Sequence, residues 1–136
     1  MAVSQPDRRA ADGNEVQIPI LIHVGDRDAQ YNLGRMYLDG NGGFKDPKQA
    51  VRWLLVAARK GQYQAQAVLG SMLFKGDTVP RQGPRGLMWL TLARDAATPR
   101  ETWITDLYAA AVKQASEDDR AVALVYLERW LKTRQD

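Results

Sequence analysis

The sequence contains no cysteine and a single histidine among its 136 residues. Without cysteine the chain has neither disulfides nor thiolate zinc sites, which fits a cytosolic or a periplasmic protein. The lone histidine, His23, lacks the second ligand or the orienting carboxylate that a metal site or an acid–base pair requires. We therefore interpret His23 as structural or solvent-facing, and we predict a protein that is not an enzyme and uses no metal or other cofactor.

Long apolar runs and a strong charge imbalance are also lacking. The longest apolar run, residues 18–24, contains a proline and a histidine and falls far below the roughly 18 residues of a membrane span. Residues 1–14 have no apolar segment of the kind found in signal peptides, so none is expected in the chain as given. The 19 basic residues nearly balance the 16 acidic ones. We predict no membrane insertion.

The basic residues do not indicate a nucleic-acid binder, because that function needs a denser patch with stacking aromatic residues. They fall mainly on the predicted second helices and their loops, and we interpret them as solvated. They are Lys45, Lys48, Arg52, Arg59, Lys60, Arg81, Arg85 and Arg94.

What the chain does have is a motif that recurs at a fixed offset of 36 residues. The first copy contains Ala29, Gln30, Leu33, Gly34, Met36 and Gly40, and the second contains Ala65, Gln66, Leu69, Gly70, Met72 and Gly76. Trp53, Leu54 and Ala57 return as Trp89, Leu90 and Ala93. A period in the range of roughly 20–50 residues is typical of a solenoid, in which one supersecondary unit stacks on its copy.

Each unit has the punctuation of a helical hairpin. In the first, residues 29–39 carry apolar side chains at helical spacing, Gly40 ends the helix, and Asp46 with Pro47 begins the next helix, which Gly61 ends. The second unit predicts helices over about 64–75 and 84–96. A glycine inside each first helix costs about 1 kcal/mol against alanine. We therefore expect a neighbouring helix backbone to pack closely at Gly34 and Gly70.

The two ends of the chain depart from the motif. A capping box at 98–101 and a cap at 116–119 predict a final helix pair with two apolar stripes, which would close the solenoid. The stripes are Trp103, Leu107, Tyr108 and Ala111, then Ala123, Leu127, Trp130 and Leu131. Upstream, residues 16–27 keep the register of a second helix, although the β-branched content of 16–24 also permits a short strand. Residues 1–15 read as a disordered arm.

These observations divide the chain into an arm (1–15) and one helical repeat domain (16–136). The domain comprises a half-repeat (16–27), repeat one (28–63), repeat two (64–97) and a capping helix pair (98–134). The predicted fold is all-α, a right-handed α-α superhelix of antiparallel helix pairs. Trp53 and Trp89 share one repeat position and are predicted to be core residues. Core is also favoured over partner contact for Trp103 and Trp130.

At these residues the chain resembles the SEL-one-like repeat family (SLR), which is related to the tetratricopeptide repeats. The family pattern of alanine, Leu-Gly, tyrosine, glycine, aspartate, alanine and tryptophan is matched in repeat one at Ala29, Leu33, Gly34, Tyr37, Gly40, Gly42, Asp46, Ala50, Trp53, Ala57, Ala58 and Gly61. Repeat two keeps Ala65, Leu69, Gly70, Gly76, Val79, Trp89 and Ala93, but has Gln82 and Gly86 in place of the aspartate and an alanine. The resemblance implies a solenoid that binds proteins.

A narrower resemblance rests on residues 86–97 and the helix pair after them. This stretch is similar to the C-terminal part of the alphaproteobacterial exopolysaccharide-regulator type of SLR protein. That resemblance implies a bacterial signalling regulator in the periplasm, whose partner is a membrane sensor histidine kinase. Without this resemblance, the expected compartment is the cytoplasm.

We predict that a partner protein binds on the concave face formed by the exposed sides of the first helices. The expected contact residues are Tyr31, Arg35 and Leu38 in repeat one and Ala67, Ser71 and Phe74 in repeat two. They lie beside the buried stripe and vary between the repeats. Two alternatives stay open: Leu38 and Phe74 pack between the units, or the unpaired N-terminal half-repeat docks on another copy and gives a homo-oligomer.

Overall fold

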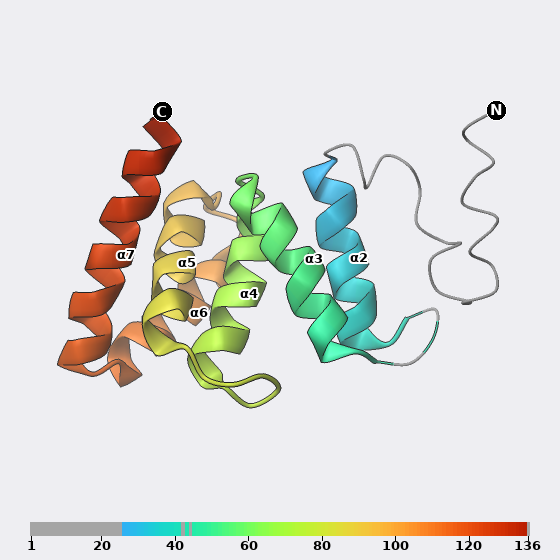
Figure 1. Cartoon of the computed structure of the whole chain (residues 1–136), viewed down its shortest axis with the longest axis horizontal. Helices are drawn as coiled ribbons and strands as arrows, with labels where there is room; N and C mark the ends of the chain where they lie inside the picture. Colours follow the sequence, from blue (N-terminus) through green and yellow to red (C-terminus); the bar gives the residue numbers. More distant parts are fainter. Residues whose placement is uncertain (1–25, 42, 44, 136) are drawn as a thin grey trace.

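A computed structural model describes residues 26–41, 43 and 45–135, which form six α-helices and no strand. They are α2 (Arg27–Asp39), α3 (Pro47–Arg59), α4 (Tyr63–Lys75), α5 (Gly83–Ala96), α6 (Thr102–Gln114) and α7 (Glu117–Gln135). In Figure 1, α7, α5, α4, α3 and α2 lie side by side in a row, in this order, and α6 lies behind α4 and α5. The all-α prediction is confirmed. The predicted arm, the half-repeat over 16–25, its strand alternative and His23 lie outside the described residues.

The α2–α3 hairpin has the predicted stop at Gly40 and the predicted start at Asp46, and its first helix begins two residues earlier than predicted. The Asp26 carboxylate accepts a hydrogen bond from the Ala29 amide at 3.0 Å and starts α2, and Asp46 does the same for Gln49 at 3.2 Å and starts α3. Gly40 ends α2 in the left-handed conformation, with φ of 82°, where a side chain would be strained. Local sequence therefore sets both helix starts and the first stop.

The α4–α5 hairpin follows the same plan, but a glutamine replaces the capping aspartate at the start of each helix. The Gln62 side chain caps α4 by accepting from the Ala65 amide at 2.6 Å, and Gly76 ends the helix with φ of 69°. At the start of α5, Gln82 replaces the aspartate of repeat one and makes no capping hydrogen bond through its side chain. Pro84 in the first turn supplies the preset φ of a helix start instead.

Both interior glycines lie where two helices approach closely, as predicted. A Cβ atom on Gly70 would lie 2.8 Å from the Gly86 carbonyl oxygen and 3.0 Å from the Leu90 nitrogen. One on Gly34 would lie 2.8 Å from Leu54 Cγ and 3.2 Å from the Leu54 nitrogen. Glycine at these two positions lets α2 approach α3, and α4 approach α5, more closely than any other residue would.

The first of the two capping helices begins later than predicted, and the second begins as predicted. Thr98 and Glu101 do interact, because the Thr98 amide donates to Glu101 Oε1 at 2.9 Å, but residues 98–100 form a turn and α6 begins only at Thr102. The α7 cap is as expected: the Asp119 amide donates to Ser116 Oγ at 3.0 Å, and the Ser116 amide donates to Asp119 Oδ2 at 3.3 Å.

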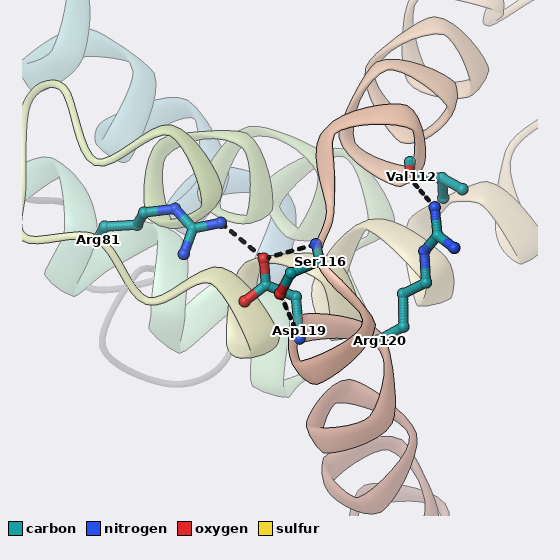
Figure 2. A network of polar contacts seen from close by, with 5 residues as sticks. All are labelled: Arg81, Val112, Ser116, Asp119 and Arg120. Atoms are coloured by element: carbon teal, nitrogen blue, oxygen red, sulfur yellow. Dashed lines mark hydrogen bonds and ion pairs between the residues drawn. The ribbon is translucent and has the colours of Figure 1, made fainter.

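Arg81 ties the loop before α5 to the start of α7 (Figure 2). Its Nη2 atom lies 2.8 Å from Asp119 Oδ2, and its guanidinium carbon lies 4.9 Å from the centre of the Phe74 ring. The hydrogen bond from Arg81, followed by the hydrogen bond from the Ser116 amide, holds the pKa of Asp119 below its ordinary value despite the opposing effect of burial. A single carboxylate thus caps α7 and joins it to repeat two.

The core runs through α3, α4 and α5, and the four tryptophans differ in their share of it. Trp89 is 4% exposed, and Trp130 packs against it edge-on, with ring centroids 5.0 Å apart. Trp53 is half-buried. Trp103 is 38% exposed, so its assignment to the core is wrong, because Ile104 takes the buried position on α6. Leu131, predicted in the α7 stripe, is also exposed.

Candidate protein-binding surfaces

Two of the predicted contact residues of repeat one, Tyr31 and Arg35, form a polar group with Asp39 on α2. Arg35 Nη1 donates to the Tyr31 hydroxyl oxygen at 3.0 Å, and Arg35 Nη2 lies 3.4 Å from Asp39 Oδ2. Burial opposes the charge of the guanidinium, but Tyr31 and Asp39 outweigh it and raise the pKa of Arg35. Tyr31 and Leu38 each bury part of their surface against the core. Arg35 is therefore held by a hydroxyl and a carboxylate on the helix that also carries the half-buried Leu38.

The predicted contact residues of repeat two lie deeper than expected. Ala67 is fully buried between Ala93 and Ile104, and Phe74 is 5% exposed in a cluster with Leu87 and Leu90. These two side chains are therefore not on an exposed face, because α6 and α7 cover the second repeat. Phe74 thus packs between units, as the alternative interpretation stated.

Ser71 remains half-buried at the edge of a small hollow of about 90 Å³ between α4 and α6. Phe74 also lines this hollow, together with Lys75, Leu90, Leu107, Ala110, Ala111 and Gln114. Its size suits one side chain rather than a chain segment. The predicted first-helix face therefore consists of the Arg35 group on α2 and this shallow site on α4.

A much larger hollow, of about 560 Å³, lies between α3 and α7 with α4 and α5 at its base, and we call it the α3–α7 groove. Its lining residues are Val51, Leu55 and Arg59 of α3, Leu69 and Leu73 of α4, Gln82 before α5, Arg85, Met88 and Trp89 of α5, and Tyr126, Arg129, Trp130 and Thr133 of α7. In Figure 1, α4 and α5 lie between α3 and α7 in the row, as this lining requires.

The groove combines an apolar floor with a basic border. Every charged side chain in its lining is an arginine: Arg59, Arg85 and Arg129. Arg85 lies over the Tyr126 ring, with its guanidinium carbon 4.4 Å from the ring centre. The arrangement offers cations and aromatic surface to the same bound molecule.

A hydrogen bond from α7 to the C-terminus of α3 bridges one end of the groove, and a second arginine, on α2, binds the same end of α3 from outside the groove. Arg134 Nη1, near the end of α7, donates to the Arg59 carbonyl oxygen at 2.7 Å, and Arg27 Nη1 of α2 donates to the Lys60 carbonyl oxygen at 2.9 Å. Arginines suit this place because the last carbonyls of a helix lack partners and carry partial negative charge. Arg134 also lies 5.2 Å from the centre of the Trp130 ring.

The sequence reasoning missed this groove. It interpreted Arg59 and Arg85 as solvated residues and assigned no role to Arg129 or Arg134. The available signal was the apolar spacing of α7, in which Tyr126, Trp130 and Thr133 share a face. That spacing identifies a buried stripe, but nothing in it says that the stripe meets α3, which lies more than 60 residues away.

Groupings typical of metal sites or membrane spans are lacking in the described part of the chain. Among residues 26–41, 43 and 45–135, no three histidine, cysteine, aspartate or glutamate side chains are placed to hold a metal ion. None of the described helices is both long enough and apolar enough to cross a bilayer.

The fold and surfaces together define an α-solenoid repeat protein. The family model of the Sel1 repeat matches residues 27–62 and 64–97, which together make up half of the chain, and the chain belongs to the Sel1 repeat family. The recognition made from the repeated motif is therefore confirmed. The repeat fold favours a non-catalytic protein-interaction module.

Two curated relatives carry the name exopolysaccharide production negative regulator. The protein of Rhizobium meliloti (strain 1021) is 36% identical over 98 residues, and that of Rhizobium leguminosarum bv. viciae is 38% identical over 99 residues. Each match covers 71% of this chain and 35% of the relative, so the chain spans about a third of the length of these relatives. The predicted likeness to this type of regulator is confirmed.

Solved structures agree on the fold. A protective antigen from uropathogenic Escherichia coli strains, which displays an SLR fold, superposes with a TM-score of 0.70 at 26% identity, covering 81% of this chain and 23% of the antigen. A Sel1 repeat protein from Oxalobacter formigenes superposes with a TM-score of 0.52 at 27% identity, covering 76% of this chain and 91% of that protein. The chain is thus an SLR solenoid.

Proposed function

We propose that this chain is a non-catalytic protein-binding module that uses the first-helix face of repeat one as a contact surface. The observation that carries the proposal is the ordered Tyr31–Arg35–Asp39 group on α2. Arginine and tyrosine are enriched among the residues that dominate interface energies, and a side chain that is already held loses less entropy on binding. Leu38 and the exposed Met36 add apolar surface on the same helix.

The likeness to the exopolysaccharide production negative regulators extends this proposal to a regulatory role. In that role the partner is a sensor histidine kinase domain, and the compartment in which the two proteins meet is the periplasm. Binding restrains the kinase by occupying a surface of the domain.

Chemical crosslinking with the sensory domain of the kinase from the source bacterium tests the proposal. Arg35→Glu should reduce the crosslinked yield because it reverses the fixed charge, whereas the matched reversal Arg52→Glu, at an exposed position on α3, should not. A yield that both variants leave unchanged contradicts the use of this face. Circular dichroism of each variant verifies that the helices are retained.

A second candidate function is self-association, which the apolar surface of α7 favours. Leu124 is 62% exposed, Leu131 is 47% exposed and Val125 is 43% exposed, so the last helix presents large apolar side chains to solvent. Among the described helices, α7 lies at the opposite end of the row from α2 (Figure 1). Sedimentation of the parent and of Leu124→Lys separates the candidates, because a parent that stays monomeric at high concentration excludes self-association.

A further inference from the structure

We infer that the α3–α7 groove binds an acidic protein segment that carries apolar anchors. This inference rests on the proposed protein-binding function and gives it a second surface, with a partner of stated chemistry. The surface is distinct from the Arg35 group, because the groove is lined by α3, α4, α5 and α7 and by no residue of α2.

The charge of the groove lining argues for an acidic occupant. Arg59, Arg85 and Arg129 are exposed, and none of the three has an ion pair with a carboxylate in the described part of the chain. The contrast is with Arg35, Arg81 and Arg94, which lie 3.4, 2.8 and 2.8 Å from aspartate oxygens. Arginines gathered at one hollow without an acid in its lining favour carboxylates brought by another molecule.

The apolar floor argues for anchors beside those acids. Val51 and Leu55 are one helical turn apart on the α3 wall and are only partly buried. Opposite them, Trp130 is partly buried against Trp89, and Tyr126 lies beneath Arg85. A hollow of this size is within the range of roughly 300–1,000 Å³ that is typical of ligand sites, and its largely apolar lining would bury aliphatic or aromatic side chains.

The dimensions of the groove set the length of the occupant. From Val51 to Arg59 the α3 wall is about 12 Å long at 1.5 Å per residue, which accommodates about two turns of helix. The hydrogen bond from Arg134 to the Arg59 carbonyl oxygen bridges the walls at the C-terminal ends of α3 and α7. The occupant is therefore a short segment of a partner protein rather than a whole domain face.

A nucleic acid is the less suitable polyanion for this groove. Backbone recognition requires a row of cations that follows successive phosphates, with exposed rings on which bases stack. Here three arginines border one hollow, and Trp89 is 4% exposed with its ring occupied by the Trp130 edge. An oligonucleotide is nevertheless included as a competitor below.

The experiment uses the full-length chain as the target and selects binding peptides from a random peptide-display library, so no partner has to be assumed. We expect the enriched peptides to combine aspartate or glutamate with large apolar residues. Arg85→Glu and Arg129→Glu should each weaken the binding of an enriched peptide by about tenfold, because each change replaces an attraction by a repulsion. The matched control Arg52→Glu, on α3 but outside the groove lining, should change the affinity by less than about twofold.

The four tryptophan indole N–H resonances report where the peptide binds. Trp89 and Trp130 line the groove, whereas Trp53 and Trp103 do not, so a groove ligand should shift the first pair and leave the second pair in place. Tryptophan-to-phenylalanine variants assign the four signals. Raising the salt concentration should weaken binding, because salt screens the attraction between the exposed groove arginines and the carboxylates of the peptide.

Several outcomes would overturn the inference and leave the proposed function standing. Three results would each exclude the groove. The enriched peptides could lack an acidic bias, they could shift only the indole resonances of Trp53 or Trp103, or their affinity could be unchanged in both Arg85→Glu and Arg129→Glu. Displacement of the peptide by a single-stranded oligonucleotide would assign the groove to nucleic acid. Failure to enrich any peptide would likewise reject the groove, while the Arg35→Glu crosslinking experiment decides the proposed function independently.

Discussion

Repeat one and repeat two share a motif but not an environment. Met36 is 44% exposed, whereas Met72 at the same repeat position is 7% exposed. Trp53 is half-buried, whereas Trp89 is 4% exposed. The two helices of repeat one therefore present to solvent, within the described structure, the same residue types that repeat two encloses.

The difference follows from the neighbours of each hairpin. The α4–α5 hairpin packs against α3 on one side and against α6 and α7 on the other. The α2–α3 hairpin contacts the rest of the described structure mainly where α3 packs against α4. The motif thus specifies a hairpin and its glycine crossing, and the position in the row decides how far each apolar side chain is buried. Equivalent substitutions in the two repeats should accordingly have unequal costs.

The largest expected difference in the free energy of unfolding between equivalent substitutions is at the repeated leucine. Leu69 is fully buried and Leu33 is half-buried at the equivalent position. Leu69→Ala should lower the free energy of unfolding by about 3 kcal/mol, since a buried leucine leaves a cavity, and Leu33→Ala should cost about half as much. Urea denaturation followed by circular dichroism measures both. Equal losses would mean that the two hairpins are packed alike in solution.

Most of the fold was predictable because its signals are local. Asp46 before Pro47, the left-handed Gly40 and Gly76, and the cap at Ser116 each act within one helical turn, so they can be read without knowledge of the rest of the chain. The predicted start of α6 was wrong because a residue far away in the sequence also binds its capping residue. Glu101 is also engaged by Tyr63, whose hydroxyl donates to Glu101 Oε1 at 2.8 Å from 38 residues away.

The candidate surfaces were less predictable because burial at a given helix position depends on distant elements. Ala67 and Phe74 lie on the side of α4 that was expected to be exposed, and α6 and α7 cover them. The α3–α7 groove depends on two segments far apart in the sequence, joined at one end by Arg134 and the Arg59 carbonyl. A repeat period contains no information about either arrangement.

The second inequality concerns the two helix crossings. Gly70→Ala would place Cβ against the Gly86 carbonyl oxygen and the Leu90 nitrogen, which cannot move without separating α4 from α5, and we expect a loss of about 2 kcal/mol. Gly34→Ala meets mainly the Leu54 side chain, and alanine regains about 1 kcal/mol of helix propensity, so its net cost should be smaller. Thermal denaturation of the two variants compares them. A Gly70→Ala protein as stable as the parent would disprove the backbone crossing.

The smallest inequality concerns the two equivalent loops, which carry Lys45 in repeat one and Arg81 in repeat two. Arg81→Ala removes the link to Asp119 and the contact with Phe74, and since Arg81 is half exposed we expect a cost of under about 1 kcal/mol. Lys45 is exposed and has no ion pair among the described residues, so Lys45→Ala should be neutral. Urea denaturation at neutral pH gives both values.

The dependence of the Arg81→Ala effect on pH separates the ion pair from simple packing. Because the folded-state pKa of Asp119 is lowered, chiefly by Arg81, the unfolded chain takes up the proton first as the pH falls. The stabilisation is therefore fully present above the ordinary aspartate pKa of about 4 and is lost as the pH falls through the folded-state pKa. The difference between parent and Arg81→Ala should shrink as the pH is lowered from about 6 to below the ordinary aspartate pKa. A difference that stays constant over this range would assign the effect to the contact between Arg81 and the Phe74 ring, because the guanidinium stays charged and the ring is neutral at every pH in the series.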